Sequence, residues 1–589
     1  MRPALWFRTG LRDWPNYLPL VPILQHYQRR DLAPDITAGI VVGMVTIPQA
    51  VAYAFLAGVP PQSGLYACLL PMLLYAVFGS SRHLVVGPVA VAALMVTAAV
   101  SEHSPKYSDA YLGITTVICL QTGIIMLLMR LTRMGGLINL LSHPVITGFI
   151  NAAAILIIIS QLPAFTGIEA GSSNSVVATL TQQLLHLSDA QPSALLIGVG
   201  SLVALFALPG LIRRAARRWR PQVSSDHALT KLGPMLVAAA AVLLIWLFGF
   251  EVAVVGDVPS GLPSFSPPPF DATLWLELLP SSMIIALVAY VESYSIGANL
   301  AAREKTRVNS HQELIALGAA NIGAAFSAAY PVAGSFSRSS VNYFAGARTP
   351  MSSIICALVI VAVLLFFTGL FTLLPHAVLA AIVMVSVIGL MDMSPLRRRN
   401  WKLQRDDVLT EYATMLLVLF VGVEIGLAAG VILSVAFFIR KSSQPNITQV
   451  GRLANTEHFR SIKRYDVETL PNVLALRVDE NIYFANATQI EDKFLKRAQR
   501  RKNTRHLLLV CTSVNMVDAT GLQMLQRLNA SLSQSGVTLS LSDVKGIVMP
   551  SLEAANLPAQ LTGRIFFTAD RAMKEFERMA RDNSDFADA

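Results

Sequence analysis

Two stretches of the sequence decide the fold: Arg82-His-Leu-Val-Val-Gly-Pro-Val-Ala90 and Tyr330-Pro-Val-Ala-Gly-Ser-Phe-Ser-Arg338. Each opens an apolar run that is shorter than the ~20 residues of a membrane-spanning helix. Pro88 stands where a helix can begin without losing a hydrogen bond, and Ser335 can cap the helix that follows it. We therefore predict two half-helices that begin inside a membrane.

The composition supports a membrane protein. Of 589 residues, 54% are hydrophobic and only 14% are charged, against ~25% in a typical soluble protein. This excludes a disordered chain, an ordinary soluble enzyme and a nucleic-acid-binding tail protein, although the net charge is +10. The four cysteines lie singly in apolar runs, which predicts buried thiols and no disulfide or zinc site; they are Cys68, Cys119, Cys356 and Cys511.

Fourteen apolar segments are candidate membrane spans. The first seven lie near residues 36–57, 64–79, 86–100, 110–131, 144–163, 193–212 and 234–250. The second seven lie near residues 278–300, 313–329, 334–346, 351–371, 376–391, 409–422 and 424–440. We therefore expect a cytoplasmic segment at 1–35, a transmembrane domain at 36–441 and a second domain at 442–589.

The basic residues orient these spans. If residues 1–35 are cytoplasmic, 25 of the 27 Lys and Arg residues before residue 442 fall in inward loops, including the clusters Arg213–Arg220 and Arg397–Arg399. Only Lys106 faces outward, and Arg338 lies inside the tenth span. This asymmetry follows the positive-inside rule, and an even number of spans leaves both termini in the cytoplasm. Residues 1–30 lack the apolar core and cleavage site of a secretory signal.

The spans divide into seven plus seven, so the two halves are inverted in the membrane. A weak sequence similarity between the halves supports this division: Leu141-Ser-His-Pro-Val-Ile-Thr-Gly-Phe-Ile150 opens the fifth span, and Leu374-Pro-His-Ala-Val-Leu-Ala-Ala-Ile382 opens the twelfth. The two broken spans, the third and the tenth, occupy matching positions in the halves. Inverted repeats with broken helices indicate a secondary transporter whose site lies near the middle of the membrane.

The candidate site combines helix ends with a buried cation. Two helix N-termini that face each other direct free N–H groups at one spot, which suits an anion. Arg338 adds a full positive charge, and a cation at that depth is usually functional; the alternative is that it pairs with a carboxylate or carbonyl and only holds the core together. In the first span, Gln49 and Tyr53 share one helix face, just after Pro48, which we expect to interrupt the helix. Tyr53 either donates to the anion or only fills space.

Glu292 is the candidate for ion coupling. It is read as the only acid buried deep in any span, surrounded by small residues such as Ser293 and Gly297. A carboxylate there can carry a proton or coordinate sodium, or it can form a structural ion pair with Arg338.

Several motifs together resemble the SulP sulfate-permease family, the bacterial relatives of the mammalian solute-carrier sulfate/anion transporters. They are Val59-Pro-Pro-Gln-Ser-Gly-Leu-Tyr66, Gly79-Ser-Ser-Arg-His83, Asn309-Ser-His-Gln-Glu313, Gly334-Ser-Phe-Ser-Arg-Ser339, Gly346-Ala-Arg-Thr-Pro350 and Val423-Glu-Ile-Gly426. The resemblance implies a homodimer in which a core of spans 1–4 and 8–11 slides as an elevator against a gate of spans 5–7 and 12–14. It implies that Glu292 couples transport to an ion. It places the anion among Gln49, Tyr53, Pro88, Val89, Phe336, Ser337 and Arg338.

The last domain has a different pattern. Short strands are expected at 473–478, 506–511 and 537–542, with helices at 487–500 and 521–534 between them, which predicts a small α/β domain. Asn515-Met-Val-Asp-Ala-Thr-Gly521 resembles the STAS domain, named for sulfate transporters and anti-sigma-factor antagonists. The antagonists carry a phosphorylated Ser where this chain has Ala519, and no Gly-rich phosphate loop supports nucleotide hydrolysis.

The leading hypothesis is a proton- or sodium-coupled importer of a small inorganic anion, most simply sulfate, in the inner membrane of a bacterium. One alternative keeps the fold and changes the cargo to bicarbonate or a C4-dicarboxylate, and another is an uncoupled exchanger or channel. We expect no enzymatic activity, no cofactor beyond the coupling ion and no nucleic-acid partner. The STAS domain can have a cytoplasmic partner, which the sequence does not identify.

Overall fold

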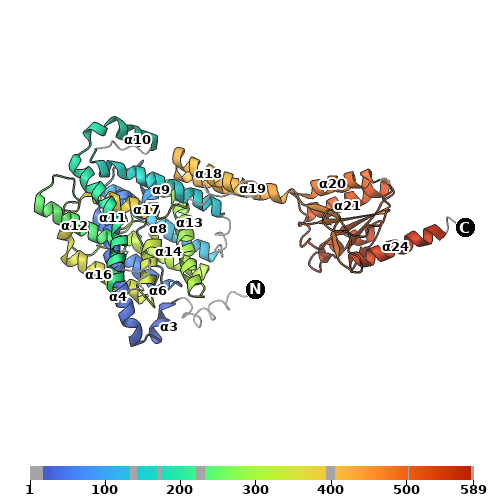
Figure 1. Ribbon diagram of the computed structural model, residues 1–589, viewed down its shortest axis with the longest axis horizontal. Coiled ribbons are helices and arrows are strands. Elements are labelled where there is room, and N and C mark those ends of the chain that lie inside the picture. Colours follow the sequence, from blue (N-terminus) through green and yellow to red (C-terminus); the bar gives the residue numbers. More distant parts are fainter. Residues whose placement is uncertain are drawn as a thin grey trace. The chain divides into compact units, whose positions relative to one another are not determined.

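The computed structural model describes residues 18–132, 142–168, 176–219, 232–392, 405–501 and 503–585. The chain forms two units, Met1–Ile432 and Leu433–Ala589, and the division falls within helix α19 (Val423–Ser442). Figure 1 shows the helices of the first unit and the α/β arrangement of the second. Most of the predicted segment 1–35 and the basic residues Arg220 and Arg397–Arg399 lie outside the described residues.

Each of the fourteen predicted spans overlaps helical structure. The first half contains α4 (Arg29–Ala57), α5 (Pro61–Tyr66) with α6 (Leu70–Phe78), α7 (Ala90–Val100), α8 (Asp109–Leu131), α9 (His143–Thr166), α11 (Pro192–Trp219) and α12 (Gly233–Phe248). The second half contains α13 (Ala272–Arg303), α14 (Ser310–Phe326), α15 (Phe336–Phe344), α16 (Met351–Phe366), α17 (His376–Ile388), α18 (Arg405–Phe420) and α19.

The predicted spans differ in the length of their helices. Within the described part of the chain, 7 helices are long and apolar enough to cross a membrane, counting α5 and α6 as one. The helices α7, α12, α16 and α17 are apolar but shorter. The short α7 and α15 are the predicted half-helices. One expectation was wrong: α4 continues through Pro48 without interruption, because one missing N–H does not end a helix that neighbouring helices enclose.

The packing of the helices repeats when the two halves are exchanged. α4 packs on α16, and their counterparts α13 and α8 pack on each other. In the same way, the pair α8 and α14 corresponds to the pair α16 and α6. The pair α9 and α18 corresponds to the pair α17 and α11. Such reciprocal contacts are expected of a two-fold-related pair of inverted repeats.

We name two groups of helices after the division that the family resemblance implies. The core group comprises α4 to α8 and α13 to α16, and the gate group comprises α9, α11, α12, α17, α18 and α19; the two groups also contact each other, since α4 packs on α17 and α12. Inside each group, glycine residues let neighbouring helix backbones come very close together, as small residues do in membrane proteins. A Cβ on Gly64 would lie 2.0 Å from the Ala50 carbonyl oxygen, and one on Gly148 would lie 2.3 Å from the Glu411 carbonyl oxygen. The four cysteines are buried and unpaired, as predicted.

The second unit contains a six-stranded sheet with the order β4-β3-β5-β6-β7-β8. The strands are β3 (Ile447–Arg452), β4 (Phe459–Ser461), β5 (Val473–Val478), β6 (His506–Val510), β7 (Thr538–Ser542) and β8 (Ile565–Phe566). β3 pairs antiparallel with β4 and β5, whereas β5 to β8 are parallel. The three strands and two helices predicted from the sequence are confirmed, the helices as α20 (Ala487–Arg500) and α21 (Ala519–Gln534).

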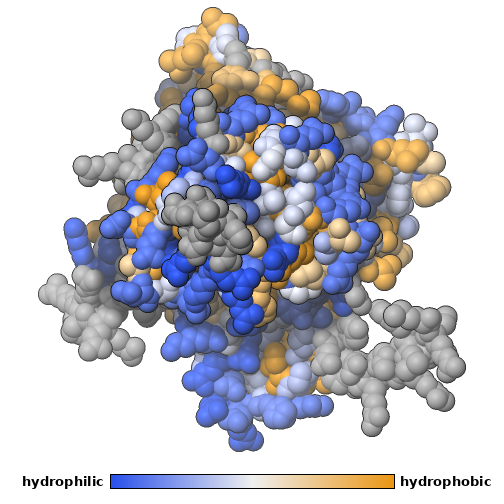
Figure 2. Space-filling view, turned by 90° about the vertical axis from the view of Figure 1, so that its right-hand side faces the viewer, coloured by the Kyte–Doolittle hydropathy of each residue, from blue (hydrophilic) through white to orange (hydrophobic). Residues whose placement is uncertain are grey.

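Both faces of this sheet are covered. Alternate residues such as Leu474 and Leu507 pack toward α20 and α21, and the intervening ones, such as Leu508, pack toward α24 (Ala569–Asp585). Parallel strands usually need helices on both faces, because both faces are apolar. The face of this unit that Figure 2 turns toward the viewer is mostly hydrophilic, as expected of a domain that lies in water.

Candidate functional site

The two half-helices begin from one small ribbon. β1 (Val86–Gly87) pairs antiparallel with β2 (Ala333–Gly334), with Val86 opposite Gly334 and Gly87 opposite Ala333. α7 begins three residues after Gly87 and α15 begins two residues after Gly334. The predicted meeting of two helix N-termini is therefore confirmed, and their free N–H groups and positive dipole ends start from the same place.

Buried side chains hold this ribbon in place. The Gly334 N–H donates to Ser293 Oγ at 2.7 Å, and the Val85 N–H donates to Ser339 Oγ at 2.9 Å. Asn321 accepts from the Val332 N–H at 3.0 Å and donates to its carbonyl oxygen at 3.1 Å. Irregular backbone at membrane depth needs such partners, because lipid supplies none.

Arg338 extends from α15 to the start of α7. Its side chain is fully buried, and Nη2 donates to the Pro88 carbonyl oxygen at 2.6 Å. Nη1 would lie 3.1 Å from a Cβ built on Gly87, so only glycine leaves the guanidinium its full space. Among the residues that the structure describes, Nε and Nη1 have no hydrogen-bond partner, and Arg338 forms no ion pair. The contact with a carbonyl group, which a purely structural role of Arg338 predicts, is thus present. The donor atoms Nε and Nη1 nevertheless remain available to a ligand in the described structure.

The remaining predicted binding residues surround this point in different ways. Gln49 and Tyr53 on α4 are buried, and within the described chain Gln49 Oε1 accepts no hydrogen bond. Tyr53 is close enough to Arg338 and Glu292 to interact with both charges. Pro88 and Val89 are buried and lie between β1 and the first residue of α7. Phe336 and Ser337 are exposed and form the first two residues of α15.

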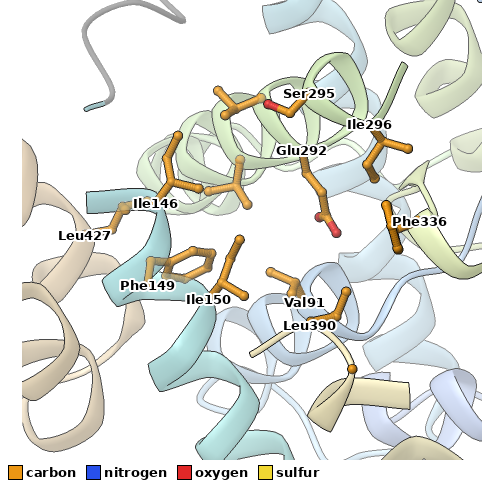
Figure 3. Close-up of a pocket in the computed structure, with 13 residues that line it drawn as sticks. Val91, Ile146, Phe149, Ile150, Glu292, Ser295, Ile296, Phe336, Leu390 and Leu427 are labelled. Carbon is orange, nitrogen blue, oxygen red and sulfur yellow. The ribbon is translucent and has the colours of Figure 1, made fainter. Parts of the chain in front are cut away.

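A cavity of about 280 Å³ lies beside these half-helices, between the core and gate groups. Figure 3 shows the Glu292 carboxylate pointing into the space near Phe336, Val91 and Leu390. The walls are mostly apolar and come from α7, α9, α13, α15, the end of α17 and α19; they are Val91, Ile146, Phe149, Ile150, Val288, Val291, Glu292, Ser295, Ile296, Phe336, Gly389, Leu390 and Leu427. Of the predicted site residues, Glu292 and Phe336 line this cavity.

The expectation that Glu292 is the only deeply buried acid was wrong. Asp35, Glu313 and Glu411 are buried more completely than Glu292, which is half-buried. Glu313 accepts a hydrogen bond from the Tyr75 hydroxyl at 2.7 Å, and Asp35 accepts from two backbone N–H groups before α16. Asp35 directly precedes the first predicted span and Glu313 opens the ninth, so the sequence places both at the ends of spans and not deep inside them. Glu292 differs because its carboxylate lines a cavity.

No metal centre accompanies the site in the described ranges: no group of three or more His, Cys, Asp or Glu side chains could hold an ion. Sequence reasoning also missed the anchors Ser339 and Asn321, because each bonds backbone atoms that no local pattern links to it.

Known families and relatives match both units. The sulfate permease family matches residues 32–414, and the STAS domain family matches residues 464–572. The probable sulfate transporter 4.2 of Arabidopsis thaliana is 33% identical over 576 residues, covering 96% of this chain and 81% of the relative. A probable sulfate transporter of Mycobacterium tuberculosis is 31% identical over 571 residues, covering 96% of this chain and 98% of the relative.

Solved structures show the same fold at lower identity. The structure of SLC26A9 superposes with a TM-score of 0.85 at 22% identity and covers 100% of this chain and 96% of that one. The transmembrane domain of the cyanobacterial bicarbonate transporter BicA gives a TM-score of 0.58 at 22% identity, covering 69% of this chain and 98% of that one. From the family match and these relatives, the chain belongs to the sulfate permease family, whose relatives are named as transporters and not as enzymes, and it carries a STAS domain in its second unit.

Proposed function

We propose that this protein imports a small inorganic anion, with sulfate as the first candidate, by coupling its movement to protons or sodium ions. The single observation that carries the proposal is the Arg338 guanidinium, buried at the junction of two helix N-termini with two donor atoms unpartnered in the described structure. A buried cation without a counter-ion is costly, and an anion would offset that cost while accepting from the helix N–H groups.

The proposed binding residues contribute charge, polar atoms and shape. Arg338 and the first N–H groups of α7 and α15 supply positive potential. Gln49 and Tyr53 supply polar atoms from α4, and Ser337 adds an exposed hydroxyl. The half-helix residues Pro88, Val89 and Phe336 shape the space around the anion. Sulfate suits such a site because it accepts many hydrogen bonds and needs donors more than a single counter-charge.

Glu292 is the proposed coupling residue. Its carboxylate lines the cavity between core and gate groups, where a proton or a sodium ion from the same side as the anion could reach it. A neutral or sodium-bound Glu292 would also lower the electrostatic cost of a double negative charge nearby. An uncoupled pore has little use for a titratable acid at this place.

The proposed transport step is an elevator movement of the core group against the gate group in each subunit of a homodimer. The mostly apolar cavity walls support it, because apolar surfaces slide without breaking many hydrogen bonds. We also propose a bacterial inner-membrane location with both termini in the cytoplasm, where the STAS domain could meet a partner.

Two alternatives remain distinct in their outcomes. The bicarbonate transporter BicA shares the fold, so bicarbonate is the second candidate cargo, with C4-dicarboxylates as a third. An uncoupled anion exchanger or channel is the alternative for the mechanism.

Uptake into liposomes tests these alternatives directly. Purified protein is reconstituted and given labelled sulfate, bicarbonate or succinate, each with an imposed proton gradient, an imposed sodium gradient or neither. The proposal expects accumulation of sulfate above equilibrium that depends on one of the gradients. Accumulation of another anion would select the alternative cargo, and equilibration that ignores both gradients would contradict coupled import.

A further inference from the structure

The second unit contains a large cavity whose walls are strongly basic. It has a volume of about 730 Å³ and lies among β3, β5, the end of β4 and the C-terminal end of α20. Six cationic side chains line it against a single carboxylate, Asp479; the cations are Lys463, Arg464, Arg477, Arg497, Arg500 and Arg501.

Part of this charge is held in place by the fold. Arg497 Nη2 donates to the Ile447 carbonyl oxygen at 2.8 Å, and Arg501 donates to the Val473 and Leu470 carbonyl oxygens at 3.2 and 3.0 Å. These bonds fix the direction of the two guanidinium groups, so little side-chain entropy would be lost when a ligand binds.

Most of the remaining charge has no carboxylate partner in the described part of the chain. Arg477 pairs with Asp479, whereas within the described chain Lys463, Arg464 and Arg500 form no ion pair. Arg497 Nη1 is buried and, in that same part of the chain, has no hydrogen-bond partner. Burial lowers the pKa of Arg497, because desolvation disfavours its charged form. Cavities with walls of one sign concentrate counter-ions, and the volume falls within the range of small-molecule sites.

We propose that this cavity binds an anion that carries two or more phosphate groups. Arginine forks match phosphate oxygens in pairs of hydrogen bonds, and six cations exceed what a single sulfate or phosphate would neutralise. The ligand could be a soluble diphosphate or the headgroup of a diphosphate lipid. The second source is plausible because Asn446 at the cavity wall follows the end of α19 by four residues, at most ~14 Å of extended chain.

The linker to α19 is also tied to the cavity wall. Lys493 on α20 donates from Nζ to the Pro445 carbonyl oxygen at 3.1 Å, and the Tyr483 hydroxyl bonds Ser442 at the end of α19. A ligand that stabilises the basic end of α20 would therefore act on the segment that leads to the last membrane helix. This site is separate from the transport site, so its test does not depend on the proposed cargo.

The experiment uses the full chain in nanodiscs and two exposed positions on α20 as a matched pair. Arg500→Gln removes a cation from the cavity, and Lys496→Gln removes an exposed cation of the same helix that does not line it. Lys463→Gln is a second cavity variant on another element. In phosphatidylcholine nanodiscs, calorimetric titration with inorganic pyrophosphate measures the soluble arm. In nanodiscs that contain cardiolipin, mass spectrometry of the lipid retained after delipidation measures the lipid arm.

The two sources give different results. Pyrophosphate binding that is about 10-fold weaker in each cavity variant, and unchanged in Lys496→Gln, supports the proposal with a soluble ligand; a loss of this size corresponds to one charge-assisted hydrogen bond. Cardiolipin retention that falls in the cavity variants alone supports it with a lipid ligand. The proposal is overturned if neither probe binds, if the control variant loses as much as the cavity variants, or if inorganic sulfate binds as tightly as pyrophosphate.

Discussion

Replacing Arg338 separates an anion-binding role from a structural one. Arg338 contacts the start of α7 through the Pro88 carbonyl oxygen at 2.6 Å, and in the described part of the chain its Nε and Nη1 have no partner. If these two atoms bind the anion, Arg338→Ala removes two charge-assisted hydrogen bonds. If the residue only holds α7 and α15 together, the same change removes one hydrogen bond to a carbonyl group.

The two roles predict different magnitudes. Hydrogen bonds to charged groups contribute about 1.5–3 kcal/mol each, so the loss of two weakens anion binding by about 10²- to 10⁴-fold. Arg338→Lys keeps the charge but loses the planar fork, so we expect a loss of about one bond, or roughly 10- to 100-fold. An unpaired Pro88 carbonyl costs about 1–3 kcal/mol of stability, and removal of an uncompensated buried charge offsets part of that cost.

Equilibrium binding of the radiolabelled anion that gives uptake in liposomes is the assay, with the melting temperature measured on the same samples. Arg348→Ala is the control, since Arg348 is an exposed arginine that pairs with Asp31 at 2.9 Å and lies beyond the C-terminal end of α15, opposite to the end where Arg338 lies. The reasoning fails if Arg338→Ala binds the anion within about threefold of the wild type while its melting temperature falls, because the guanidinium would then be a structural tie only.

Three further predictions test other parts of the molecule. Glu292→Gln should abolish the dependence of uptake on the coupling gradient while anion exchange persists; a preserved dependence, measured in liposomes, would move coupling to another residue. Gly64→Ala should lower the melting temperature strongly, because its Cβ would lie 2.0 Å from the Ala50 carbonyl oxygen and overpacking costs ~1–3 kcal/mol or more, whereas Gly210→Ala, which meets nothing within 4 Å, should not lower it. Burial lowers the pKa of His506, so its neutral form stabilises the folded second unit; that contribution is complete above the unfolded pKa of about 6.5 and is lost as the pH falls. The protection factors of the β6 amides against hydrogen exchange should therefore fall on acidification more in the wild type than in His506→Gln, and an equal fall would contradict the sign.

Spans and half-helices could be predicted because they rest on local properties. An apolar run of sufficient length, a basic loop and a Gly-Pro or Gly-Ser break each lie within a few neighbouring residues, and the positive-inside asymmetry tests their count over the whole chain. The parallel strands of the second unit were visible for the same reason, since each is a short apolar run between helices.

The residues that position the site could not be predicted in this way. Ser339 binds the backbone of Val85, 254 residues away, and Glu313 binds the Tyr75 hydroxyl, 238 residues away. Such contacts depend on how the two halves fold around each other, and a serine or glutamate that makes one looks like any other in the sequence. At Pro48 the prediction failed for the opposite reason. A proline inside a helix is a strong local indication of a break, but the packing around α4 keeps the helix continuous.

The proposed coupling residue is linked to the proposed anion site through the residue that follows it in the sequence. Glu292 lines the cavity, and the next residue, Ser293, accepts the hydrogen bond from the Gly334 N–H at the ribbon that opens α15. Ser293 also donates to the Ala289 carbonyl oxygen one turn earlier on α13, so its hydroxyl is fixed by α13 and fixes β2 in turn. A change in the charge of Glu292 that shifts this turn of α13 would therefore be felt at the N-terminus of α15, where Arg338 lies. Because Glu292 and Arg338 both belong to the core group, ion binding in the proposed mechanism would alter the proposed anion site while the two residues move together against the gate group.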